Sequence, residues 1–261
     1  MEFQDILYEK YNNRAKITIN RPDKMNMFTN HTLCEMISAL QNAWTDKEVG
    51  AVIIIGAGNK AFTIGGSPEE VDSDASPIEK LPMPSLFAQL LQTIRNIPKP
   101  VIAAVNGYAI GGGHVIQVVC DLTIASSSAK FGQVGPKVGS FDAGYGSAYL
   151  SRIVGEKKAR EFWYLCKKYG AEECMQMGLV NAVAAPEELM EETDRWVDTI
   201  VKHSPTSLAA LKMSFNADTD SVWGIQSMAG VALNMYFETD EAKECGKAFR
   251  EKRDPNVAQY R

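Results

Sequence analysis

Residues 131–146 constrain the fold of this chain more than any other segment, because five of these sixteen residues are glycines. Glycine loses more backbone entropy on folding than any other residue, so this density is tolerated only where the backbone turns tightly or approaches a ligand closely. The segment has a single acid, Asp142, with Ser140 two residues before it. A second glycine cluster lies shortly upstream, at residues 107–113. Together the two clusters predict one active site that is built on backbone amides.

Composition excludes several classes of protein. The chain has 261 residues, of which 45% are hydrophobic and 23% charged, as in an ordinary globular protein with a full core. The net charge of −5 and the lack of a basic run argue against a nucleic-acid partner. The five cysteines form no CxxC pair, so neither a metal site nor a disulfide framework is expected. No leader pattern and no apolar run of about 20 residues is visible, which predicts a cytoplasmic protein without membrane contact.

The order of predicted elements indicates an α/β fold. A hairpin is expected over residues 7–19, and a helix over 32–44 with Thr29 as its N-cap. Buried strands at 49–56, 101–105 and 121–125 alternate with helices at 85–96 and 114–120. A short strand is expected at 180–183. Further helices are predicted over 144–153, 156–168, 171–177, 186–203, 204–216, 220–236 and 240–252. We therefore expect a core over residues 1–200 and a helical region over 201–261 that contributes to an oligomer and to the active site.

Two glycine positions are candidates for binding an anionic oxygen. Gly66 follows a short strand-like run, and Gly112 lies where a helix begins. Two backbone N–H groups that point at one oxygen form an oxyanion hole, and a helix N-terminus adds a favourable dipole. Taken alone, the glycine triplet at 111–113 fits close packing of a helix on a strand equally well.

Several motifs, in their order and spacing, resemble the crotonase (enoyl-CoA hydratase/isomerase) superfamily over nearly the whole chain. These motifs are residues 20–22, 58–66, 98–103, 106–113, 120–122 and 131–133. The resemblance implies a ββα spiral core with a C-terminal helical region, and an acyl-CoA substrate with no permanently bound cofactor. It also implies an oxyanion hole from the amides of Gly66 and Gly112, and a homotrimer or a homohexamer made of two trimers.

The resemblance further implies which residues contact coenzyme A. Phe249 and Lys252 match positions that reach CoA from a neighbouring subunit, although a solvated helix face is the competing interpretation of Lys252. Lys60 could pair with the CoA phosphates. The full set of predicted CoA-binding residues is Lys60, Ala61, Ile64, Gly66, Tyr108, Phe249 and Lys252.

Two departures from the hydratases narrow the function. Hydratases of the superfamily carry one glutamate where this chain has Val115 and a second glutamate where it has Gly135. A hydratase must activate water and move a proton to carbon, and neither valine nor glycine can do so. Simple hydration is therefore disfavoured, unless a carboxylate from elsewhere replaces both glutamates.

Residues 135–146 are similar to 1,4-dihydroxy-2-naphthoyl-CoA synthase and 2-ketocyclohexanecarboxyl-CoA hydrolase, which close and open a ring respectively. This resemblance implies that Ser140, Asp142 and Tyr236 carry the proton transfers. Each residue also has a plainer interpretation. Asp142 suits a turn, Ser140 a loop hydrogen bond, and Tyr236 the packing of a helix. His114, next to the glycines, is expected to begin a helix rather than to act as a base.

Three features favour ring opening, as in alicyclic or aromatic degradation. Residues 17–26 look like the hydrolase, and the first strand begins without the N-terminal extension of the synthases. Residues 67–74 carry four acids and no base, which would repel a carboxylate substrate. Val134 also replaces the threonine that helps one synthase class hold bicarbonate. A ring-closing synthase, a hydratase with an atypical acid and base, and a non-catalytic CoA-binding module remain alternatives.

Overall fold

The computed structural model describes residues 2–67 and 85–261. Its strands are β1 Ile6–Tyr11, β2 Arg14–Ile19, β3 Ala51–Gly56, β4 Ala61–Thr63, β5 Val101–Val105, β6 Tyr108–Ile110, β7 Leu122–Ser126, β8 Lys130–Gly132, β9 Lys168–Gly170 and β10 Ala182–Ala184. Its α-helices are α1 Asn30–Thr45, α2 Leu86–Asn96, α3 Gly112–Val119, α4 Gly135–Val138, α5 Leu150–Val154, α6 Glu156–Leu165, α7 Ala171–Gln176, α8 Leu189–Ile200, α9 Pro205–Ala217, α10 Ser221–Phe237 and α11 Asp240–Arg250.

A six-stranded sheet in the order β1-β2-β3-β5-β7-β10 forms the centre of the molecule. The β1–β2 hairpin is antiparallel and all later pairs are parallel, so the sheet is mixed. Successive side chains of β3 point to opposite faces. Val52 and Ile54 join the core cluster that includes α1, α2 and α3, whereas Ala51 and Ile53 pack with Leu189 and Val197 of α8. Both faces are therefore covered, which explains the continuous apolar strands.

A smaller sheet in the order β4-β6-β8-β9 positions the glycine clusters. The strands β4, β6 and β8 run parallel, and β9 pairs antiparallel with β8. Because the carboxyl ends of parallel strands meet at one edge, residues 64–66, 111–112 and 133–135 leave the sheet side by side.

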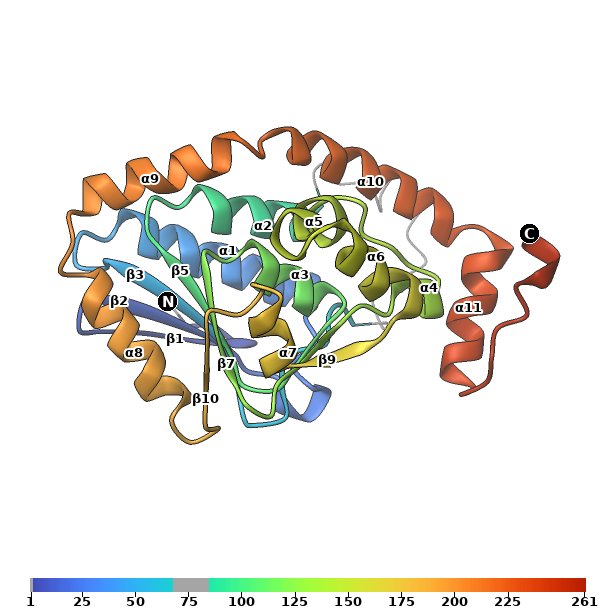
Figure 1. The fold of residues 1–261 in the computed structure, drawn as a ribbon, viewed down its shortest axis with the longest axis horizontal. Helices are drawn as coiled ribbons and strands as arrows, with labels where there is room; N and C mark the ends of the chain where they lie inside the picture. Colours follow the sequence, from blue (N-terminus) through green and yellow to red (C-terminus); the bar gives the residue numbers. More distant parts are fainter. Residues whose placement is uncertain (1, 68–84) are drawn as a thin grey trace.

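The C-terminal helices lie on the outside of the molecule. Figure 1 shows α9 and α10 along one long side, and α11 beside the C-terminus at one end. Lys212 of α9 anchors this region, since its Nζ donates to the carbonyls of Ile94 and Lys99 and to Asp121 Oδ2, at 2.9, 3.0 and 2.6 Å. At the far end α11 packs on α4, where Gly139 touches the backbone of Ala242.

The structure confirms the predicted α/β order and corrects several boundaries. The helix predicted over 156–168 ends at Leu165, because Cys166 adopts the left-handed conformation with φ of 46°. Residues 168–170 form β9 instead, since they pair with β8. The helix predicted over 144–153 is a π-helix, Tyr145–Tyr149, followed by α5. The helix α3 begins at Gly112 rather than at residue 114, and α8 is shorter than 186–203.

Within residues 2–67 and 85–261, no helix combines the length and the apolar character that crossing a bilayer requires.

Candidate active site

The predicted oxyanion-hole residues lie on two segments that touch each other. A Cβ atom placed on Gly65 would lie 3.1 Å from the amide nitrogen of Gly112, and one placed on Gly112 would lie 3.5 Å from Gly65 Cα. Gly65 has φ of +100° and Gly111 has φ of +56°, which is backbone that favours glycine. The glycines are therefore needed both for conformation and for this close approach.

Among residues 2–67 and 85–261, the amides of Gly66 and Gly112 have no backbone hydrogen-bond acceptor. Phe28 N–H donates to the Gly65 carbonyl at 3.0 Å, and Ser67 N–H donates to the Phe28 carbonyl at 2.8 Å. Since N–H groups alternate in direction along an extended strand, the Gly66 N–H points away from Phe28. Gly112 is the first residue of α3, so its N–H has no acceptor within the helix. Both amides can thus donate to a substrate oxygen.

Asp142 is held by a close set of neutral donors. Its Oδ1 accepts hydrogen bonds from Gly146 N–H at 2.7 Å and from Gly144 N–H at 3.1 Å. Its Oδ2 accepts from the Gln226 side-chain amide at 3.3 Å. Gly144 directly precedes the π-helix Tyr145–Tyr149 and Gly146 is its second residue, so the start of this helix supplies both backbone donors. One oxygen is therefore fixed by the backbone and the other by a side chain of α10.

The environment of Asp142 disfavours its ionised form. Burial raises the pKa of the Asp142 carboxyl, and the three donors, from Gly146, Gln226 and Gly144, offset only part of that rise. A carboxyl with a raised pKa accepts a proton more readily than an ordinary aspartate, which suits a general base.

The Asp142 carboxylate lies close to Val115, in the first turn of α3. A Cβ atom placed on Gly146 would lie 2.9 Å from Asp142 Oδ1 and 2.9 Å from a methyl carbon of Val115. Asp142 and Val115 thus flank the same glycine. Gly135 differs, because a Cβ there would lie 2.5 Å from the Ser140 carbonyl oxygen and 2.8 Å from the Trp163 ring. Position 135 has no room for any side chain.

Neither Ser140 nor Tyr236 is among the hydrogen-bond partners that the described residues give to Asp142. Ser140 is half-buried, and its N–H donates to the Gly135 carbonyl at 2.9 Å. The Tyr236 ring packs on Phe141, with 5.7 Å between ring centroids, but its hydroxyl donates to Glu241 at 3.4 Å. Burial and the nearby Glu241 raise the pKa of Tyr236 to about 12, so the phenol stays protonated.

His114 is fully buried and neutral. Burial lowers its pKa to about 3, and its Nδ1 lies 3.0 Å from the amide nitrogen of Gln133, on the loop that leads to Gly135. The ring also packs 5.2 Å from Phe162. His114 therefore links α3 to the loop after β8, and it is the third residue of a helix that begins at Gly112 rather than the residue that begins it.

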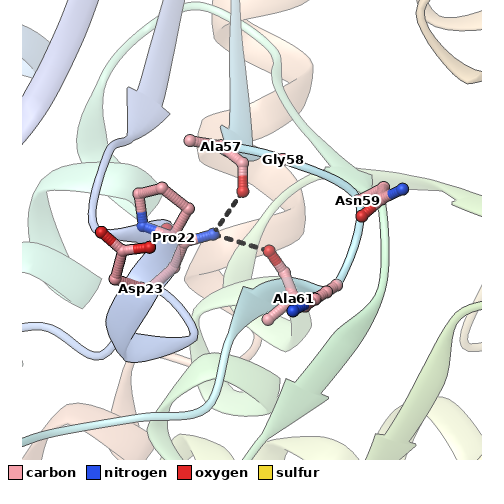
Figure 2. A pocket seen from close by; sticks show the side chains of 8 residues that line it. Pro22, Asp23, Ala57, Gly58, Asn59 and Ala61 are labelled. Atoms are coloured by element: carbon pink, nitrogen blue, oxygen red, sulfur yellow. Dashed lines mark hydrogen bonds between the residues drawn. The ribbon is translucent and has the colours of Figure 1, made fainter.

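The predicted CoA-binding residues fall into two groups. Lys60 and Ala61 line a cavity of about 140 Å³ with Pro22, Asp23 and Asn59. The side-chain amide of Asn26 also lines this cavity. Its nitrogen donates to the carbonyls of Ala57 and Ala61, at 3.0 and 2.7 Å, and Figure 2 shows both hydrogen bonds as dashed lines.

The other predicted CoA-binding residues do not line this cavity, but Tyr108 lies beside it, since its N–H donates to the Lys60 carbonyl at 3.0 Å. Ile64 is half-buried directly before Gly65. Tyr108 is exposed at the start of β6, and the Lys168 ammonium lies over its ring. Phe249 is exposed in the last turn of α11, and Lys252 is exposed just after this helix ends. The acidic residues at 68–74, including Glu69 and Glu70, fall outside the described residues.

Gln226 is the main site residue that sequence reasoning missed. It lies on the buried face of α10 with Val222 and Ala229. A polar residue at helical spacing within an apolar stripe was the available signal, because a buried amide needs a partner.

A family model described as enoyl-CoA hydratase/isomerase matches residues 9–260 of this chain. A solved structure described as an enoyl-CoA hydratase from Mycobacterium avium subsp. paratuberculosis K-10 is 27% identical, with 98% of this chain and 99% of that chain covered and a TM-score of 0.85. An enoyl-CoA hydratase/isomerase from Pseudoalteromonas atlantica T6c is 26% identical, with 98% and 100% covered and a TM-score of 0.88.

An enoyl-CoA hydratase from Bacillus anthracis is 28% identical, with 97% of this chain and 98% of that chain covered and a TM-score of 0.76. These similarities extend over both the sheets and the C-terminal helices. The chain belongs to the enoyl-CoA hydratase/isomerase family, within the crotonase superfamily of enzymes that act on CoA thioesters.

Proposed function

We propose that this protein hydrolyses a carbon–carbon bond in a cyclic β-ketoacyl-CoA and thereby opens the ring. The observation that supports this most strongly is the carboxylate of Asp142, which flanks Gly146 together with Val115 and has a raised pKa. It provides one general base beside the glycine-lined segments.

The two positions that carry glutamates in hydratases argue against ordinary hydration. Val115 has no proton to exchange, and its side chain is buried. Gly135 is enclosed by the Ser140 backbone and Trp163, so a second carboxylate cannot be placed there without moving the loop. A single carboxylate suits a reaction in which water attacks a ketone and the leaving group is a stabilised enolate.

In the proposed reaction the thioester oxygen accepts hydrogen bonds from the amides of Gly66 and Gly112. Asp142 removes a proton from water, and the oxygen of that water adds to the ring ketone. The bond between the former ketone carbon and Cα then breaks, and its electron pair forms the thioester enolate. Protonation of Cα by Asp142 gives an open-chain acid that remains a CoA thioester. The product equals the substrate plus one water, and each oxyanion donor contributes on the order of 3 kcal/mol.

Ser140 and Tyr236 have supporting roles in this proposal. Ser140 orients the attacking water. Tyr236, whose phenol is protonated and rests on Phe141, is a second proton donor once its hydroxyl turns from Glu241.

In this proposal four residues contact CoA from the subunit that provides the oxyanion hole. They are Lys60 and Ala61, which line the cavity, together with Ile64 and Tyr108. Phe249 and Lys252 reach CoA from a neighbouring copy in a trimer or hexamer.

The test is incubation of the purified protein with 2-ketocyclohexanecarboxyl-CoA and, separately, with succinylbenzoyl-CoA, followed by mass spectrometry. The proposal predicts a gain of one water on the cyclic substrate and no change in the other. Loss of one water from succinylbenzoyl-CoA would instead establish ring closure, for which the same groups act in reverse. Hydration of crotonyl-CoA without either reaction would contradict the proposal and favour a hydratase.

A further inference from the structure

Gln226 of α10 connects the C-terminal helices to residues 139–144, which we call the Asp142 loop. Its side chain is 6% exposed, and both ends of its amide are used. The Nε2 group donates to Asp142 Oδ2 at 3.3 Å, and Oε1 accepts from Tyr145 N–H at 2.9 Å. A backbone N–H can only donate, so Oε1 must face Tyr145 and the NH₂ group must face Asp142. The neighbours therefore determine the orientation of this amide.

The backbone around Gln226 is shaped for close contact. A Cβ atom placed on Gly144 would lie 2.2 Å from Gln226 Oε1 and 2.7 Å from Gln226 Cα. Gly144 is thus the residue that lets α10 approach the loop. Every other residue type at position 144 would push Gln226 away from Asp142.

Tyr145 is also held by side chains of α2. Its hydroxyl donates to Gln92 Oε1 at 3.0 Å, and the Arg95 guanidinium lies 5.1 Å from its ring centroid. Arg95 also donates to Thr219 Oγ1 at 2.7 Å, two residues before α10 begins. The acceptor for the Tyr145 N–H is therefore held between two anchored elements, so Gln226 has little freedom to turn.

We propose that Gln226 is a positioning residue that holds Oδ2 of Asp142 toward the reacting water, an inference that rests on the proposed function. The two backbone donors occupy Oδ1, so Oδ2 is the oxygen left to take the proton. Of the three donors that the described residues offer to Asp142, Gln226 is the one side chain. The rotation of the carboxyl group thus depends on this amide.

The direction in which the pH profile should move depends on which protonation state of Asp142 the Gln226 side-chain amide stabilises. An N–H donor stabilises the ionised carboxylate and lowers its pKa. In the described part of the chain, the other groups that hydrogen-bond to Asp142 are the N–H groups of Gly144 and Gly146, and a peptide N–H does not titrate. Asp142 acts as a base only when ionised, so activity falls as the pH drops through its pKa. Loss of the Gln226 donor raises that pKa and moves the acid limb of the profile to higher pH.

The experiment compares Gln226→Met, which keeps the size but loses both hydrogen bonds, with Gln226→Glu, which keeps the acceptor and loses the donor. Gln41→Met, at an exposed glutamine of α1, is the matched control. Circular dichroism checks that each variant folds, and the glutamate variant remains a test if the methionine variant does not. Rates are measured against pH with the cyclic substrate.

We expect kcat to fall by roughly 10- to 100-fold in both variants, with KM nearly unchanged. The acid limb should move up by about 1 pH unit in the methionine variant, and further in the glutamate variant, where two carboxyl groups face each other. The control should match the parent protein. A folded Gln226→Met variant with unchanged kcat, or with lower kcat and an unmoved acid limb, would overturn the positioning role.

A second measurement does not depend on turnover. The carboxyl pKa of Asp142 can be followed by NMR in protein labelled with ¹³C-aspartate, and its signal is assigned by its loss in Asp142→Asn. An unchanged pKa in Gln226→Met contradicts the inference even if the cyclic substrate is not converted. A raised pKa in a protein that converts no cyclic substrate supports the inference and counts against the proposed function alone.

Discussion

At the scale of single residues, the glycines around the site have different reasons for being glycine. A Cβ atom on Gly66 would make ordinary contact with the Phe28 ring at 3.5 Å. A Cβ atom on Gly113 would lie 2.0 Å from the Thr63 carbonyl oxygen, which is backbone of β4 and has little freedom to move. Position 66 therefore has room for a methyl group, whereas Gly113 is required for the close packing of α3 on β4.

This difference predicts that the same change, from glycine to alanine, affects stability little at position 66 and strongly at position 113. Gly66→Ala should change the free energy of unfolding by less than about 0.5 kcal/mol. Gly113→Ala should lower it by roughly 2 kcal/mol, because α3 must move off β4. Urea denaturation followed by tryptophan fluorescence measures both. Equal effects of the two substitutions would show that the contacts inferred around α3 are wrong.

At the scale of elements, the Asp142 loop and α10 form one unit through a pair of polar side chains. The acid at position 142 accepts and the amide at position 226 donates. Exchanging the two groups reverses the donor and the acceptor while keeping the other contacts, since both the loop N–H groups and Tyr145 N–H still meet an oxygen.

We expect Asp142→Asn and Gln226→Glu to be non-additive. Each alone sets two donors or two acceptors face to face, so each should destabilise the fold. The double variant restores a donor opposite an acceptor, and its coupling energy should be about 1 to 2 kcal/mol in favour of the fold. Its activity should stay at least roughly 100-fold below the parent, because the carboxylate is no longer at position 142. Recovered turnover in the double variant would argue against the role of Asp142.

Elements with long apolar patterns were predictable from the sequence, whereas among the three-residue strands β10 was expected near its place, at 180–183, and β9 was not expected at all. The helix α1 follows its Thr29 cap, and β5 follows its run of buried residues. By contrast, β9 has three residues and exists because it pairs with β8, which periodicity cannot reveal. The π-helix at Tyr145–Tyr149 likewise depends on tertiary contacts, since Gln226 and Gln92 hold Tyr145 from two other helices.

The candidate site was predictable where its residues stand out in the local sequence, and not where they depend on tertiary contacts. Gly66, Gly112 and Asp142 stand out as residue types in unusual local sequence. The contribution of Gln226 required knowing which face of α10 meets the loop, and that is a property of the folded chain.

At the scale of the whole molecule, an ion pair with a buried lysine ties the C-terminal helices to the central sheet. The Lys212 side chain is 7% exposed and contacts Asp121, whose Oδ2 also accepts from Val101 N–H at 2.7 Å. The pair thus joins α9 to the start of β5 and the residue before β7. Because α10 follows α9, this anchor also supports the position of Gln226.

Removing the lysine should destabilise the entire fold. Lys212→Met leaves the Asp121 carboxylate and two carbonyls without their donor, which should lower the free energy of unfolding by about 3 kcal/mol. Lys202→Met, at an exposed lysine after α8, is the control and should have little effect. Chemical denaturation measures both. A loss below about 1 kcal/mol at position 212 would mean that the C-terminal helices do not depend on this anchor.

The most direct test of the account is the turnover of Asp142→Asn on 2-ketocyclohexanecarboxyl-CoA, measured beside the dissociation constant for the same thioester. Asp254→Asn, at an exposed aspartate near the C-terminus, is the control. The account predicts that kcat falls by at least roughly 100-fold in Asp142→Asn while thioester binding and folding are retained, because the general base alone is lost. A folded Asp142→Asn enzyme with the turnover of the parent protein would contradict the central role of this carboxylate.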